Sequence, residues 1–170
     1  MPAHCYEMIG GEGGGVGAVV VAEAPPELPL LDATFPLLRF WRETASQGWS
    51  GSPRPEAPEA LWDALWANIE TGYRGYASEI YRFDFTPMKV VAFDGALRQV
   101  VDTCMFGLPP DAKRVARLDN AHDVEISEGF RPPIVGPYRE AIALLRKWNH
   151  RVLVAATDTQ RVGVVWATGA

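Results

Sequence analysis

The stretch MKVVAFDGALRQVVDTC, residues 88–104, sets our expectation for the fold. Its apolar first part ends at Asp94 and Gly95. Apolar residues then recur at helical spacing, at Leu97, Val100, Val101 and Cys104. A short apolar run, a turn and a 3.6-residue period together predict a strand, a corner and a helix. The carboxylate of Asp94 would stand where the strand ends, and sites in open α/β folds are often built at such points.

The same segment resembles the first motif of the haloacid-dehalogenase-like phosphatases, in which a strand ends in Asp-x-Asp-Gly-Thr-Leu. The first aspartate of that motif attacks phosphorus and the second acts as acid and base; Ala92 and Asp94 occupy these positions here. The run 152–157, which ends in a threonine, is similar to the second motif of the family. The resemblance implies a small metal-dependent hydrolase. However, Ala92 cannot supply the nucleophile that covalent phosphoryl transfer requires.

Asp94 also has two structural interpretations. As a helix N-cap it would accept a hydrogen bond from the backbone N–H of Ala96 or Leu97, which is worth about 1 kcal/mol. Alternatively, Asp94 and Gly95 could form a tight hairpin between two strands. The helical spacing that follows favours the N-cap, and we prefer it to a catalytic role.

A second candidate site is the polar run DNAHDVEISE, residues 119–128. If residues 122–126 form a strand, Asp123 and Glu125 share one face, and Asp119 lies nearby in the chain. Three carboxylates could hold a hard divalent cation through oxygen ligands. Loop carboxylates are more often solvated or turn-forming. We therefore predict no metal site and no cofactor, and keep Asp94, Asp119, Asp123 and Glu125 as the catalytic residues of the hydrolase alternative.

Both ends of the chain predict β-hairpins. Residues 3–9 and 16–23 flank a glycine-rich turn, and residues 151–157 and 161–167 flank the turn 158–160. Helical spacing predicts three further helices, at about 35–47, 58–81 and 137–149. The prediction is therefore an α+β fold, a single domain over 1–170, with a mostly antiparallel sheet from the N- and C-terminal hairpins packed against three or four helices.

The predicted helix over residues 58–81 is rich in aromatic residues on one face. We single out Trp62, Trp66, Tyr73 and Tyr76. Such a face usually packs into a core, but an exposed one marks a partner site, because Trp and Tyr are enriched in binding hot spots. These four are our candidate binding residues.

Composition and charge narrow the function classes. The net charge is −5, and residues 1–85 carry 12 acidic and 5 basic side chains. This balance lacks the clustered basic face that nucleic-acid binding requires, and it would suit a protein partner with a basic surface. No apolar run approaches the roughly 18–20 residues of a membrane span. The first basic residue is Arg39, so we expect no secretory signal, no membrane partner and a cytoplasmic protein.

Since no complete catalytic set is visible, we expect a protein that acts without catalysis by binding another macromolecule. Inhibitors, immunity-type proteins and assembly subunits act in this way. Self-association through the aromatic face remains open. The alternative is the metal-dependent hydrolase centred on Asp94.

Overall fold

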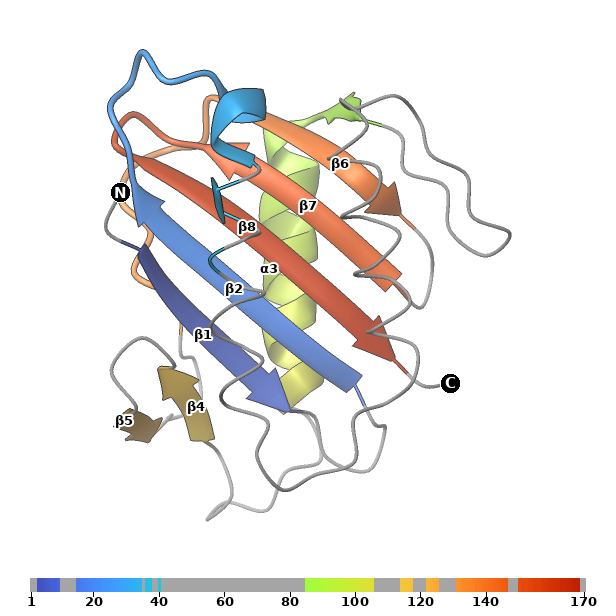
Figure 1. The fold of residues 1–170 in the computed structure, drawn as a ribbon. Coiled ribbons are helices and arrows are strands. Elements are labelled where there is room, and N and C mark those ends of the chain that lie inside the picture. Colours follow the sequence, from blue (N-terminus) through green and yellow to red (C-terminus); the bar gives the residue numbers. More distant parts are fainter. Residues whose placement is uncertain are drawn as a thin grey trace.

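Eight strands form one antiparallel sheet within the part of the chain that the computed structural model describes, residues 3–9, 15–34, 36–37, 40, 85–105, 114–117, 122–125, 131–146 and 150–168. The strand order is β3-β6-β7-β8-β2-β1-β4-β5 (Figure 1). The strands are β1 (Ala3–Ile9), β2 (Gly15–Glu23), β3 (Thr86–Met88), β4 (Arg114–Arg117), β5 (His122–Glu125), β6 (Glu140–Arg146), β7 (His150–Ala156) and β8 (Gln160–Thr168). Helix α3 (Val90–Met105) crosses one face of this sheet.

The continuous apolar run of β2 reflects burial on both faces of the sheet. Val19 and Val21 face the core that contains α3, whereas Val20 and Ala22 face the core on the opposite side. All four side chains are at most 3% exposed. Because neighbouring strand residues point to opposite faces, a strand covered on both sides must be apolar at every position.

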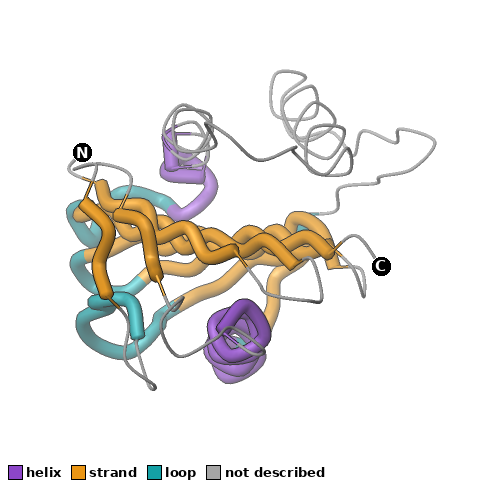
Figure 2. The backbone as a smooth tube through the Cα atoms, turned by 90° about the horizontal axis from the view of Figure 1, so that it is seen from below, coloured by secondary structure: helices purple, strands orange, loops and turns teal. Residues whose placement is uncertain are grey.

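Two cores lie on the two sides of the sheet. The edge-on view in Figure 2 shows α3 on one side of the sheet and the short helical segment 30–34 on the other. The α3 side is filled by Phe93, Leu97, Val100 and Val101 packing onto β2, β6, β7 and β8. On the other side the short helical segment 30–34 contributes Leu30, and Leu37 lies in the same cluster. The sheet is thus the middle layer of the described structure.

The predicted hairpins at both ends of the chain are confirmed. β1 pairs with β2 from Ala3↔Ala22 to Ile9↔Val16, and β7 pairs with β8 from His150↔Ala167 to Ala156↔Arg161. The short strand predicted near 122–126 is also present, as β5. The two hairpins join through a ladder of nine pairs between β2 and β8, from Gly15↔Thr168 to Glu23↔Gln160. This ladder forms the centre of the sheet.

The prediction of three or four helices against the sheet is wrong. The described residues contain one long helix, α3, together with short helical pieces at 30–34, 36–37 and 40, and they are dominated by strands. The predicted helix over 58–81 lies outside the described residues, as does most of the one over 35–47. The helix predicted over 137–149 is instead strand β6.

A register shift explains why β6 looked helical. Its pairing with β7 shifts between Ala143 and Leu145. Ala141 and Ala143 therefore pack into the core on the α3 side, whereas Leu144 and Leu145 both belong to the opposite core. A bulge of this kind breaks the two-residue alternation that identifies a strand. The strand also consists largely of alanine and leucine, good helix formers that the tertiary context overrides.

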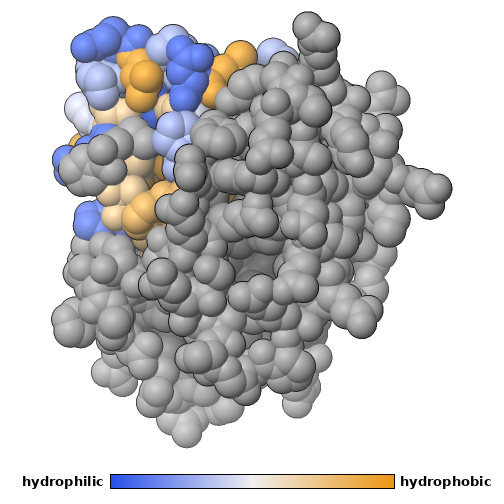
Figure 3. Space-filling view, in the orientation of Figure 1, coloured by the Kyte–Doolittle hydropathy of each residue, from blue (hydrophilic) through white to orange (hydrophobic). Residues whose placement is uncertain are grey.

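Figure 3 shows the face of the molecule opposite α3. The described residues visible there combine hydrophilic side chains at one corner with hydrophobic ones beside them. Leu31, in the helical segment on this side of the sheet, is 42% exposed. The structure offers no helix, within the described ranges, with the length and apolar character needed to cross a membrane.

Candidate functional site

Asp94 does not lie at the end of a strand. The segment predicted as strand, Val90–Phe93, is the first turn of α3, and the amide of Phe93 donates to the carbonyl of Lys89 at 3.1 Å. The predicted strand-corner-helix is therefore wrong, and so is the N-cap interpretation, because the helix begins at Val90. Val90 and Val91 favour a strand by propensity, but the apolar run is too short for periodicity to decide.

The carboxylate of Asp94 is part of a helix-surface ion pair. Its Oδ2 atom lies 3.0 Å from Nε of Arg98, one turn later. The Asp94 side chain is 38% exposed and that of Arg98 is 62% exposed. Pairs at this spacing and exposure contribute about 0.3–0.5 kcal/mol. The geometry is that of helix stabilisation on the protein surface.

The other residues of the hydrolase alternative are not brought to Asp94 by any described contact. Asp123 and Glu125 lie on β5, opposite Ala116 and Arg114 of β4, and Asp119 lies outside the described residues. In the described ranges no group of three or more histidine, cysteine, aspartate or glutamate side chains is placed to hold a metal ion. Trp62, Trp66, Tyr73 and Tyr76 also lie outside the described residues.

Tyr138 lies beside Asp94 and packs against α3. Its ring meets that of Phe93 edge to face, with centroids 4.9 Å apart and an interplanar angle of 72°. The pKa of Tyr138 is raised to about 12, chiefly by burial and also by the negative charge of Asp94, while the positive charge of Arg98 partly opposes the shift. The phenol therefore keeps its proton at neutral pH and can donate a hydrogen bond, but it cannot act as a base there.

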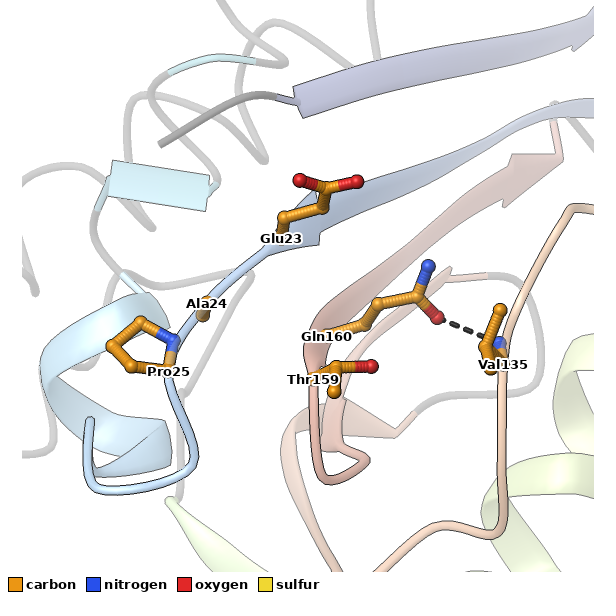
Figure 4. A pocket seen from close by; sticks show the side chains of 6 residues that line it. All are labelled: Glu23, Ala24, Pro25, Val135, Thr159 and Gln160. Atoms are coloured by element: carbon orange, nitrogen blue, oxygen red, sulfur yellow. Dashed lines mark hydrogen bonds between the residues drawn. The ribbon is translucent and has the colours of Figure 1, made fainter.

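A groove opens at the end of the sheet where β2 and β8 make their last pair. Six residues line it, and we call it the end groove: Glu23, Ala24, Pro25, Val135, Thr159 and Gln160. Its volume is about 430 Å³. Figure 4 shows Glu23, Ala24 and Pro25, at and just after the end of β2, on one side. Thr159, Gln160 and Val135 lie on the other. The amide of Ala24 donates to the carbonyl of Thr159 at 2.9 Å and closes the base between the two sides.

Gln160 fixes the far wall of the end groove. Its Oε1 accepts from the amide of Val135 at 2.7 Å, and its Nε2 donates to the carbonyl of Pro133 at 3.2 Å. Gln160 is only 9% exposed, so these two bonds are partly buried. The side-chain amide thus replaces a strand partner for the loop 131–137. Val135 itself stays 64% exposed, and Gly136 takes the positive φ of 81° that turns the loop.

Arg161 fixes the near wall from the opposite face of the sheet. Its guanidinium donates to the carbonyls of Pro25 at 3.0 Å and Pro26 at 3.4 Å, and also to that of Leu28. Its Nη1 donates to the carbonyls of Thr157 at 3.1 Å and Gln160 at 3.0 Å. Arg161 is 1% exposed, and its Nε has no hydrogen-bond partner in the described structure. One buried side chain therefore ties the loop after β2 to the turn between β7 and β8.

Arg161 faces the opposite side of the sheet from Glu23, the charged residue that lines the end groove. Val21 of β2 and Val162 of β8 belong to the core on the α3 side. Glu23 is two residues from Val21, and Gln160 is two residues from Val162, so both share that face, whereas Arg161 faces away. Glu23 is exposed and forms no ion pair among the described residues. Nearby, the exposed Arg139 and Asp158 form an ion pair with each other.

Sequence reasoning did not identify the end groove. The turn 158–160 was predicted, but Glu23 and Gln160 are neighbours only through the register of β2 with β8. The attachment of the loop 131–137 to Gln160 carries no local sequence signal. No family model, curated protein or solved structure matches this chain.

Proposed function

We propose that the protein acts by binding another protein, through the end groove and the adjoining loop 131–137. The supporting observation is that the buried side chains of Gln160 and Arg161 hydrogen-bond to the backbone of both walls of the groove, while Val135 stays 64% exposed. A single exposed apolar side chain is ordinary on a protein surface. An exposed one on a loop that hydrogen bonds already hold in place can be covered by a partner without the cost of ordering that loop.

Immobilised walls favour binding for a thermodynamic reason. Association costs free energy when loops and side chains must be ordered at the interface, and a surface ordered in advance avoids part of that cost. Here the loop after β2, the turn 157–160 and the loop 131–137 are joined by hydrogen bonds of 2.7 to 3.4 Å. An inhibitor, an immunity protein or an assembly subunit in the cytoplasm would use such a surface.

The other candidate surface is the aromatic one predicted from the sequence, with Trp62, Trp66, Tyr73 and Tyr76. It is compared with the end groove in the same assay. Asp94, the centre of the hydrolase alternative, forms an ion pair with Arg98 on a helix surface, and this geometry gives that alternative no support.

The test is quantitative capture from the native cell with the tagged full-length protein and its Val135→Asp variant. Val91→Asp is the matched control, because Val91 is 80% exposed on α3 and does not line the end groove. We expect one captured protein to be retained by Val91→Asp and lost with Val135→Asp, while thermal unfolding shows both variants folded. The purified pair is then measured by titration calorimetry.

Two results would contradict the proposed surface. The first is a partner that binds Val135→Asp as tightly as the unmodified protein. The second is a partner lost in Trp62→Ala and Trp66→Ala, both folded, yet retained in Val135→Asp; this would place the interface on the aromatic surface instead.

A further inference from the structure

We infer that the end groove receives a lysine or arginine side chain of the partner protein. Its aliphatic stem would lie against Pro25 and Val135, and its charged head would pair with Glu23. This inference rests on the protein-binding function proposed above and specifies the chemistry of the contact. It follows from the carboxylate of Glu23, which has no ion pair among the described residues.

The charge of the groove comes from Glu23. Its carboxylate is exposed and has no ion pair among the described residues, whereas the side-chain amide of its cross-strand partner Gln160 donates one hydrogen bond to Pro133 and accepts one from Val135. Thr159 adds an exposed hydroxyl to the same lining. A carboxylate with a hydroxyl beside it offers acceptors, and ammonium and guanidinium groups are the donors that match them.

The walls of the groove are suited to the stem of a basic side chain. Pro25 and Val135 are both exposed and line it on opposite sides. Lysine and arginine lay their methylene groups along apolar surface while the charged head stays in water. The volume of about 430 Å³ lies at the lower end of the range for small-ligand pockets, about 300–1,000 Å³, which suits one side chain.

The two nearby cations do not oppose this assignment. The guanidinium of Arg161 faces the other side of the sheet and is surrounded by five carbonyl oxygens. Arg139 is already paired with Asp158. With a net charge of −5, the whole protein attracts a basic partner over longer range as well.

The experiment uses two small probes with the same stem, Nα-acetyl-lysine methylamide and its uncharged counterpart Nα-acetyl-norleucine methylamide. Each is titrated into the ¹⁵N-labelled full-length protein and followed by amide chemical shifts. We expect the lysine probe to give saturable shifts at Ala24, Val135 and Gln160. We expect the norleucine probe to bind about fivefold more weakly, as the loss of one exposed charge pair implies.

Glu23→Gln should weaken the lysine probe by the same factor of about five and leave the norleucine probe unchanged. Glu27→Gln is the matched control, because Glu27 is also exposed but does not line the groove, and it should leave both affinities unchanged. Equal binding of the two probes, an unaffected Glu23→Gln variant, or no shifts at the groove would each overturn the inference.

These outcomes are separable from those of the proposed function. If Val135→Asp loses the partner but the lysine probe does not discriminate by charge, protein binding stands and the basic side chain is ruled out. If the probe discriminates but Val135→Asp retains the partner, the groove chemistry stands and the proposed interface fails.

Discussion

Arg161 donates from its Nη2 atom to the carbonyl oxygen of Pro25 at 3.0 Å, so that a side chain of the last described strand holds the loop that follows β2. Arg161 is 1% exposed, and a charge at that depth is expensive unless it is well solvated by the protein. Among the described contacts, all the hydrogen bonds of the Arg161 guanidinium go to backbone carbonyl oxygens. The arrangement makes Arg161 the residue on which the geometry of the near wall depends.

Replacing Arg161 with methionine should strongly destabilise the fold. The change keeps much of the side-chain volume but removes the Arg161 donors from the carbonyls of Pro26, Leu28 and Thr157, at about 1–3 kcal/mol for each buried one left unsatisfied. The carbonyls of Pro25 and Gln160 keep a backbone donor each. We expect the free energy of unfolding in urea to fall by about 3 kcal/mol or more. Arg146→Met, at an exposed position at the end of β6, is the control and should change it by less than about 0.5 kcal/mol. A loss below about 1 kcal/mol for Arg161→Met would refute this role.

Alanine at two glycines should shift stability in opposite directions. Gly95 lies inside α3, and a Cβ there meets nothing within 4 Å, so Gly95→Ala should raise the free energy of unfolding by up to about 1 kcal/mol. Gly136 has φ +81° in the loop 131–137, so Gly136→Ala should lower it by about 1 kcal/mol or more. Thermal unfolding of the two variants checks both signs. Stabilisation by both would show that the loop does not need the left-handed conformation.

Tyr138 should titrate late, and its titration should be linked to stability. Its pKa in the folded protein is about 12, above the unfolded value of 10. The protonated phenol therefore contributes to the stability of the folded protein, and this contribution is fully present below pH 10. It is then lost as the pH rises through about 12. Ultraviolet difference titration of the unmodified protein against Tyr138→Phe isolates this phenol. Asp94→Asn should lower the pKa and Arg98→Gln should raise it, whereas no response to either would disprove the electrostatic coupling.

Arg151 of β7 should be coupled by a modest amount to Trp166, its cross-strand partner on β8. Its Nη1 donates to Oε1 of Gln99 at 2.7 Å, and its guanidinium lies 5.3 Å from the ring centroid of Trp166. A partly exposed cation–π contact contributes about 0.5–1 kcal/mol. A double-mutant cycle with Arg151→Met and Trp166→Leu should give a coupling of that size in urea unfolding. A coupling indistinguishable from zero would mean that the stacking contributes nothing.

The sequence predicted the hairpins because their information is local. β2, β7 and β8 are β-branched or alanine-rich runs bounded by turn residues, and the two predicted strand pairings are present. The errors arose where local signals conflict with the tertiary environment. Val90 and Val91 favour a strand yet begin α3, and the bulge at Ala143 and Leu145 gives β6 the spacing of a helix.

The end groove could not be predicted from the sequence for a different reason. Asp94 attracted attention as an Asp-Gly corner, a purely local feature, and the structure places it in mid-helix. The end groove depends instead on pairings between distant segments: Glu23 with Gln160 across the ladder, and Gln160 with the loop at Val135. Neither the strand register nor the side-chain contact produces a recognisable pattern in the neighbouring sequence.

The ladder between β2 and β8 also dictates the order in which the protein can be built. A ribosome makes the β1–β2 hairpin first and β8 after every other described strand. Until β8 has been made, β2 has no partner along the edge that β8 will occupy, so an apolar strand has one unpaired edge. Contacts between such distant segments also slow folding. The nine-pair ladder at the centre of the sheet can therefore form only after Gln160–Thr168 have been synthesised.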